Sequence, residues 1–129
     1  MKTGRGSHGD VNFDFLRSVN IIFLFRILID KKREVLKLLQ EIPKGKVTTY
    51  AILGKKVGLH PRTVGMIMRD NDRPETYPCY KVVASNGRLG GYNLGSKEKI
   101  RRLRKDGILI KEGKISAFGE KLHKFDNRG

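Results

Sequence analysis

The 129-residue chain has one cysteine, no tryptophan and only three histidines. A single cysteine excludes an internal disulfide, a composition that suits a reducing compartment. Because His8, His60 and His123 are scattered, the chain has no metal-binding cluster at a known spacing. We therefore expect no disulfide, no bound metal and no cofactor.

Long hydrophobic runs are also missing. None reaches the roughly 18 apolar residues that a membrane-spanning helix needs. The run from Val19 to Ile29 is interrupted by Asn20 and Arg26, and it lacks the small-residue cleavage site of a signal peptide. We expect a soluble, cytoplasmic protein that is not inserted in a membrane.

Acidic residues are scarce beside basic ones, with 13 Asp and Glu against 28 Lys and Arg and a formal net charge of +15. Such an excess concerns partners rather than fold, and a polyanion such as nucleic acid is the usual partner. A basic protein of the membrane surface is the alternative. The length indicates one domain with a single modest core.

Composition divides the chain into three parts. Residues 1–30 begin with a Gly-, Asn- and charge-rich segment without periodicity, which predicts a disordered arm over residues 1–18 or an extension from an upstream start codon. Residues 21–29 are compatible with a strand or a helical turn. Residues 31–116 hold the periodic segments, and residues 117–129 are typical of a basic tail.

Two helices are expected in the first part of the periodic region. Asp30 is a suitable N-cap for a helix from Lys31 to about Glu41. After a turn at residues 43–46, Thr49 is a suitable N-cap for a helix over residues 50–57.

A third helix is expected over residues 62–70, with Pro61 at its start, where the missing N–H costs little. Gly58 lies where the end of the preceding helix needs a left-handed residue. Two short helices around a glycine turn, the second carrying Arg62 and Arg69, are typical of a helix-turn-helix.

The only cysteine lies in residues 78–83 (PCYKVV), just before a short strand predicted at Val82 and Val83. A lone cysteine is most often a small buried hydrophobe. Here Cys79 lies between a nucleic-acid-binding element and a Gly90-Gly91 loop, and this context makes it a candidate nucleophile.

The remaining chain predicts a helix over residues 97–105, capped by Ser96, and a hairpin formed by residues 108–110 and 114–115. We expect Ile100 and Leu103 on the buried face of the helix. The other face should be a cationic surface made of Lys97, Lys99, Arg101, Arg102, Arg104 and Lys105.

From about Lys32 to Ile115 the chain resembles the C-terminal DNA-binding domain of O⁶-alkylguanine-DNA alkyltransferases and of the related alkyltransferase-like proteins. The matching segments are residues 42–50, 62–65, Asn71, 78–83 and 87–92, in order and in spacing. The resemblance implies a mostly α fold with a small β element, of the winged helix-turn-helix-like kind. It also implies a monomer whose partners are double-stranded DNA with alkylated guanine and other repair proteins.

The resemblance also implies a role for each matching residue. Cys79 would accept the alkyl group in one irreversible transfer, from a guanine flipped out of the duplex. Arg62 would replace the flipped nucleotide, Tyr50 would support its phosphate or base, and Asn71 would organise the turn near the thiol. The other implied DNA contacts are Thr63, Gly65 and Arg69, and the base pocket would be lined by Gly90, Gly91 and Tyr92.

The chain departs from the family at one catalytic position. Tyr80 stands where the family has a histidine that relays the thiol proton toward a glutamate, and Asp106 stands at the position of that acid. A tyrosine, with an ordinary pKa of about 10, is a poor base at neutral pH. Lys81 and other nearby cations are candidates to lower the thiol pKa instead.

Three functions therefore stay open: a single-use alkyltransferase that acts through Cys79, a non-catalytic sensor that binds alkylated guanine and recruits other repair factors, and a sequence-specific regulator with an inert thiol.

Overall fold

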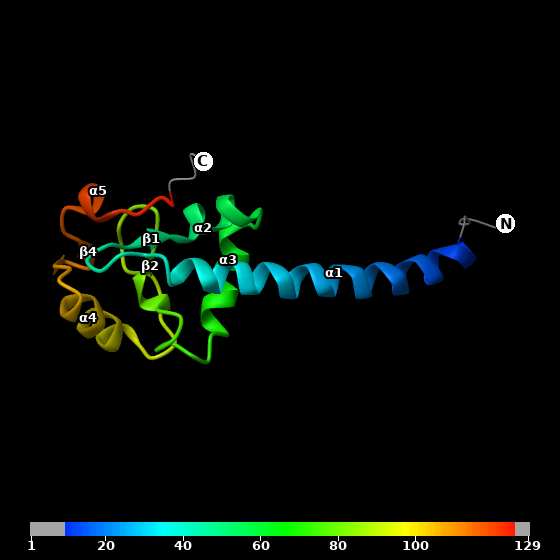
Figure 1. Cartoon of the computed structure of the whole chain (residues 1–129), viewed down its shortest axis with the longest axis horizontal. Helices are drawn as coiled ribbons and strands as arrows, with labels where there is room; N and C mark the ends of the chain where they lie inside the picture. The colour runs from blue at the N-terminus through cyan, green and yellow to red at the C-terminus, as the bar shows by residue number, and fades with distance from the viewer. Residues whose placement is uncertain (1–9, 126–129) are drawn as a thin grey trace. The chain divides into compact units, whose positions relative to one another are not determined.

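The computed structural model describes residues 10–125, with the backbone alone for residues 10–20. Its elements follow one another as α1 (Asp10–Leu39), β1 (Thr48–Thr49), α2 (Tyr50–Val57), α3 (Pro61–Arg69), the 3₁₀ turn η1 (Cys79–Lys81), β2 (Val82–Val83), α4 (Ser96–Lys105), β3 (Ile110–Lys111), β4 (Lys114–Ile115) and α5 (Phe118–Lys121) (Figure 1). The chain divides into two compact units, with the boundary after Arg33. The expected division at residue 30 into an extension and a domain stays a prediction.

The first helix differs from its prediction. α1 begins at Asp10 instead of Lys31, so Asp30 lies inside the helix and does not cap it. The disordered arm expected over residues 1–18 is wrong from Asp10 onward, where α1 begins, while residues 1–9 lie outside the described residues. Residues 21–29 are helical, and their exposed apolar side chains are Ile21, Ile22, Phe23, Leu24, Phe25, Leu28 and Ile29. Within residues 10–125, no helix is both long and apolar enough to cross a membrane.

The helix-turn-helix is formed by α2 and α3, as predicted. The Thr49 hydroxyl accepts a hydrogen bond from the Ile52 N–H at 3.0 Å and so caps α2. Gly58 ends the helix at φ +79°, a left-handed conformation that glycine adopts without a steric cost. Pro61 then opens α3, whose buried residues are Val64, Ile67 and Met68.

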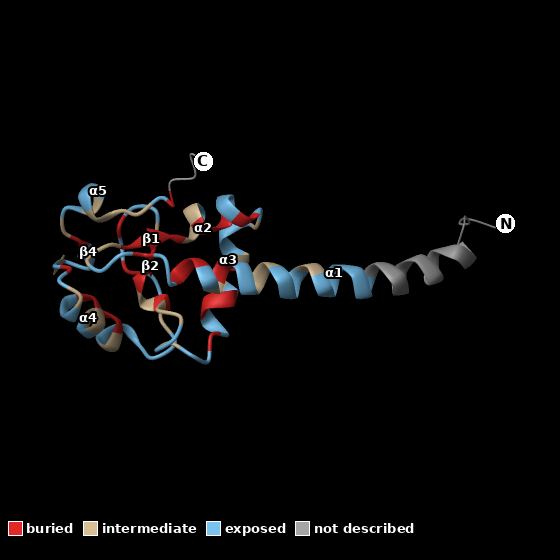
Figure 2. Cartoon of the chain, viewed as in Figure 1, coloured by how far each residue is buried: buried red, intermediate tan, exposed pale blue. Residues whose placement is uncertain are grey.

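A short parallel strand pair separates two cores. β1 and β2 pair with Thr48 opposite Val82 and Thr49 opposite Val83. Because successive side chains of a strand point to opposite faces, Val82 packs with the end of α1, α2 and α3, whereas Val83 packs with Leu103 of α4. The buried residues of this unit gather on these strands and on the facing sides of the helices (Figure 2).

The structure of α4 (Ser96–Lys105) differs from the prediction in its N-cap and in the burial of Lys99. Gly95, at φ +93°, precedes the helix at the capping position, and Ser96 is the first helical residue and makes no cap. Lys99, expected on the cationic surface, is fully buried at 0% exposure. Leu103 is buried as expected, and the predicted hairpin is present as β3 paired with β4.

The described part of the expected basic tail, residues 117–125, packs against the domain. It forms α5, and its Leu122 bridges to Val47 next to β1. Phe125 is 5% exposed and belongs to the core that also contains Val82. The expected mostly α fold with a small β element is confirmed.

Candidate functional site

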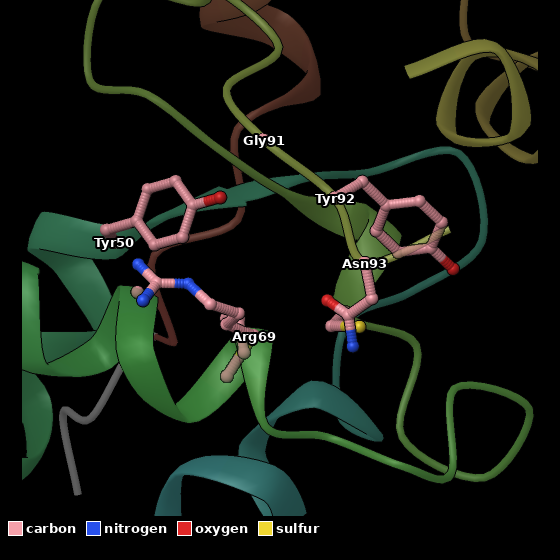
Figure 3. Close-up of a pocket in the computed structure, with 8 residues that line it drawn as sticks. Tyr50, Arg69, Gly91, Tyr92 and Asn93 are labelled. Atoms are coloured by element: carbon pink, nitrogen blue, oxygen red, sulfur yellow. The ribbon is translucent and has the colours of Figure 1, made fainter. Parts of the chain in front are cut away.

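A cavity of about 440 Å³ lies between the helix-turn-helix and the loop that follows β2 (Figure 3). Such a volume falls within the roughly 300–1,000 Å³ of small-ligand pockets. The lining residues are Tyr50, Gly65, Met68, Arg69, Cys79, Gly91, Tyr92 and Asn93. Because Cys79 is only 2% exposed, its thiol is accessible only to a group that enters this cavity.

The local sequence explains how the cysteine is held. Cys79 begins the 3₁₀ turn after Pro78, and its N–H donates to the Tyr77 carbonyl at 2.7 Å. The turn continues directly into β2, which is buried between the two cores. The nucleophile candidate therefore sits at the start of a rigid element, as a precise site requires.

Asn71 connects the cysteine to the rest of the cavity. Its Nδ2 donates to the Cys79 Sγ at 3.2 Å and to the Tyr77 carbonyl at 2.9 Å, and its Oδ1 accepts from the Arg73 N–H at 3.0 Å. Its backbone carbonyl accepts from Asn93 Nδ2 at 2.8 Å. One buried amide thus joins the end of the helix-turn-helix, the thiol and the loop after β2.

The thiol is not activated in the free protein. Burial raises the pKa of Cys79 above its ordinary value. The hydrogen bond from Asn71, the backbone N–H of Cys79 and the positive charges of Lys99 and Arg102 lower that pKa, but burial prevails. At neutral pH the thiol is therefore mostly protonated.

Two tyrosines lie on either side of the cavity. Arg69 extends toward the Tyr50 ring, and the Tyr92 hydroxyl points away from both (Figure 3). Burial, with a smaller effect of the Cys79 thiolate, raises the pKa of Tyr50, and the same two causes lead in raising that of Tyr92 to about 12. Gly90 lies behind Tyr50, since a Cβ on it would be 3.3 Å from the Tyr50 hydroxyl.

Tyr80 and Asp106 line a different cavity, also of about 440 Å³. The Asp106 carboxylate accepts from the Gly45 N–H at 2.9 Å and lies 3.2 Å from Lys81 Nζ. Burial, and secondarily the charge of Asp106, raises the pKa of Tyr80. The second cavity is lined by Lys44, Glu75, Tyr80, Arg101, Arg102, Lys105 and Asp106, and it shares no lining residue with the cavity of Cys79.

The structure brings part of the predicted site together. The cavity contains Cys79 and the predicted residues Tyr50, Gly65, Arg69, Gly91 and Tyr92. Arg62 is exposed at the start of α3, and it lies outside the lining together with Thr63 and Gly90.

Three residues in and around the site were not predicted to belong to it. Met68 and Asn93 line the cavity, and no motif of the sequence indicates either of them. Lys99 was assigned to the surface, although it lies four residues before Leu103 and thus on the same helical face. Among residues 10–125 there is no group of three or more His, Cys, Asp or Glu side chains that is arranged to hold a metal.

These features define a helix-turn-helix domain with a cysteine-containing cavity beside its second helix. The family model "6-O-methylguanine DNA methyltransferase, DNA binding domain" matches residues 30–108, more than half of the chain. The chain belongs to this family, and the resemblance drawn from its motifs is confirmed.

Individual relatives agree with this assignment. A bifunctional methyltransferase/endonuclease of Picrophilus torridus is 45% identical over 101 residues, which are 77% of this chain and 34% of that protein. A methylated-DNA–protein-cysteine methyltransferase of Methanopyrus kandleri is 44% identical over 79 residues, 61% of this chain and 60% of that protein. The chain thus spans about a third to three fifths of the length of these relatives.

A solved structure has the same fold. It is S. pombe Atl1 in complex with damaged DNA containing O⁶-carboxymethylguanine, with a TM-score of 0.65 and 25% identity. The match covers 74% of this chain and 95% of Atl1.

Proposed function

We propose that this domain binds DNA that contains O⁶-alkylguanine and removes the alkyl group by transferring it to Cys79. The observation that carries the proposal is a nearly buried thiol lining a ligand-sized cavity beside α3. A base inside a duplex cannot reach such a thiol. The target guanine would therefore flip out, at a cost of roughly a few kcal/mol.

The transfer would be a single displacement. The Cys79 thiol loses its proton to solvent, and Sγ then forms a bond to the alkyl carbon while the bond from that carbon to guanine O⁶ breaks. The electron pair of the broken bond stays with the guanine, which takes up a proton from water and is restored. Since the new thioether is stable, each protein molecule would act once.

The helix α3 is the proposed DNA-contacting element. Arg62 is exposed at its first turn, and Arg69 lines the cavity at its last turn. Arg62 would fill the gap left by the flipped nucleotide, while Thr63 and Arg69 would contact phosphates. Gly65 faces the cavity with no atom within 4 Å of an added Cβ, so its missing side chain leaves room for the backbone of the nucleic acid.

Residues around the cavity would receive the base. Tyr50 would support the rotated phosphate or the base, and Asn71 would keep Cys79 oriented through its hydrogen bond to Sγ. Gly91 and Tyr92 would border the base on the loop side, and Gly90 would act indirectly, through its packing against Tyr50.

One observation favours a second function, that of a non-catalytic lesion sensor. Tyr80 replaces the expected base, and Tyr80 and Asp106 line a cavity that does not include Cys79. A proton relay from the thiol to Asp106 through Tyr80 therefore has little support. In this alternative the domain would bind alkylated guanine, leave it unrepaired and recruit other repair proteins.

The deciding measurement is the intact mass of the protein after incubation with a duplex that contains O⁶-methylguanine. We expect a one-methyl increment that maps to Cys79 and is absent with the Cys79→Ala variant or an unmodified duplex. An unchanged mass, with the lesion duplex bound more tightly than its unmodified control, would establish the sensor instead. An unchanged mass together with equal binding to both duplexes would refute both functions and favour a sequence-specific regulator.

A further inference from the structure

Lys99 is a fully buried lysine, at 0% exposure, on the inner face of α4. Its Nζ donates three hydrogen bonds to backbone carbonyls: to Val82 at 2.7 Å, to Leu89 at 2.6 Å and to Gly91 at 3.0 Å. An ammonium group has three N–H donors, so every donor is used. No carboxylate among the described side chains of residues 21–125 pairs with it at salt-bridge distance.

The three acceptors belong to two segments that build the cavity. Val82 is the first residue of β2 and follows the turn that begins at Cys79. Leu89 and Gly91 belong to the next loop, and Gly91 lines the cavity itself. One side chain therefore ties the strand that follows the nucleophile to the loop that lines the cavity.

The same ammonium group also acts on the thiol by its charge. Burial lowers the pKa of Lys99 to about 8, and the negative charge of the Cys79 thiolate raises that pKa. The other groups that affect Cys79 are Asn71 by its hydrogen bond and Arg102 by its charge. Tyr50 and Tyr92 also face Cys79, since its thiolate raises the pKa of both.

Arg102 is the weaker candidate for stabilising a thiolate. It lies 2.6 Å from one oxygen of Glu98 and 3.0 Å from one oxygen of Glu75, so two carboxylates offset its charge. The partners of Lys99 are three neutral carbonyls and the neutral ring of Tyr92, whose centroid lies 6.0 Å from Nζ, so no carboxylate offsets its charge. A buried charge in a medium of low dielectric acts more strongly than an exposed one.

We propose that Lys99 is a positioning residue for the reaction of Cys79, because it holds the Leu89–Gly91 loop against β2 and keeps a positive charge near the developing thiolate. The proposal rests on the proposed function for its connection to alkyl transfer. Its first test uses no DNA, so that it can fail or succeed independently of that function.

The test is the rate at which iodoacetamide alkylates Cys79, measured against pH for the wild-type protein and for Lys99→Met. Methionine keeps the length of the side chain but removes its charge and its donors. Because the pKa of Lys99 is about 8, most Lys99 side chains are charged at pH 7.5, and we expect the rate of alkylation at this pH to fall about tenfold in the variant. Lys97→Met, on the exposed face of the same helix, is the matched control and should behave as wild type.

A folded Lys99→Met protein with the wild-type pH profile would overturn the proposal. If this variant does not fold, the electrostatic interaction between Lys99 and Cys79 is measured at Lys99 instead. The titration of the Lys99 ammonium is followed by NMR in the wild-type and Cys79→Ala proteins. Because coupling is reciprocal, removing the thiolate should lower the pKa of Lys99. Identical titrations would refute the proposal.

The methyl-transfer assay separates this inference from the proposed function. If the wild-type protein transfers a methyl group, Lys99→Met should do so at least tenfold more slowly than Lys97→Met. If the wild-type protein transfers none, transferase activity is refuted, while a shifted thiol profile still supports the role of Lys99 in setting the reactivity of Cys79.

Discussion

The Asn71 side chain donates a hydrogen bond from Nδ2 to the Sγ of Cys79 at 3.2 Å, and both residues are buried. An amide stabilises a thiolate by donating to it, but it cannot take up the thiol proton. The contact therefore orients the sulfur and lowers its pKa without providing a base. Either solvent removes the proton in the reaction, or the reaction does not take place.

Replacing Asn71 should reduce the stability of the domain. Asn71→Ala removes one of the two hydrogen bonds to the Tyr77 carbonyl and leaves the Arg73 N–H without its side-chain partner, and an unmet hydrogen bond in a buried position costs about 1–3 kcal/mol. We expect a loss of about 2 kcal/mol in the free energy of unfolding, measured by urea denaturation. The control is Asp72→Ala at the exposed neighbouring position, where little change is expected. Equal stability of the two variants would contradict this role of Asn71.

Tyr80→His tests whether a base at position 80 acts on the thiol although the Tyr80 side chain lines a different cavity from Cys79. In Tyr80→His, an imidazole would lie beside Asp106, whose charge already influences Tyr80, and a histidine is a competent base near neutral pH. Positioned general bases contribute roughly 10²–10⁴-fold to a rate, and we expect at least a tenfold faster methyl transfer in single-turnover experiments. Tyr80→Phe, which removes only the hydroxyl, should react at the wild-type rate. A Tyr80→His variant no faster than Tyr80→Phe would show that position 80 does not limit the reaction.

The sequence correctly predicted the helix ends that depend on a few neighbouring residues. The caps at Thr49 and Gly58 depend on a few neighbouring residues, and both are present. The motif around Cys79 correctly indicated that this cysteine belongs to the site, since it lines the cavity. Contacts such as the one from Asn71 to Cys79 depend on the path of the intervening loop, which no periodicity predicts.

The errors have an equally physical origin. Asp30 has the chemistry of an N-cap, but a cap forms only where a helix starts, and α1 starts at Asp10. Lys99 has the chemistry of a surface residue, but its helical position aligns it with buried Leu103, and three carbonyls provide partners. Tertiary contacts override residue preference at Lys99, whereas at Asp30 the helix simply continues from an earlier start.

Gly90 and Gly91 should respond differently to the same substitution. At φ +73°, Gly90→Ala forces a side chain into a left-handed conformation, and its Cβ would lie 3.3 Å from the Tyr50 hydroxyl. We expect a loss of about 1–2 kcal/mol in the free energy of unfolding. A Cβ on Gly91 has no atom within 4 Å, so Gly91→Ala should be nearly neutral for stability. As Gly91 lines the cavity, its variant should instead bind the lesion duplex more weakly in a titration. Equal stability losses would contradict this division.

The pH dependence of Cys79 follows from the direction of its pKa shift. Since burial raises this pKa, the folded protein keeps the thiol proton to a higher pH than the unfolded chain, whose thiol has a pKa of about 8.5. The rate of alkylation by iodoacetamide should therefore still increase above pH 8.5 in the folded protein, whereas in concentrated urea it should level off near that pH. By linkage, the contribution of this thiol to stability is fully present below about pH 8.5 and is lost as the pH rises through the folded-state pKa. A plateau at lower pH in the folded protein than in urea would mean that the cations and Asn71 outweigh burial, and that the thiol is activated even without a histidine.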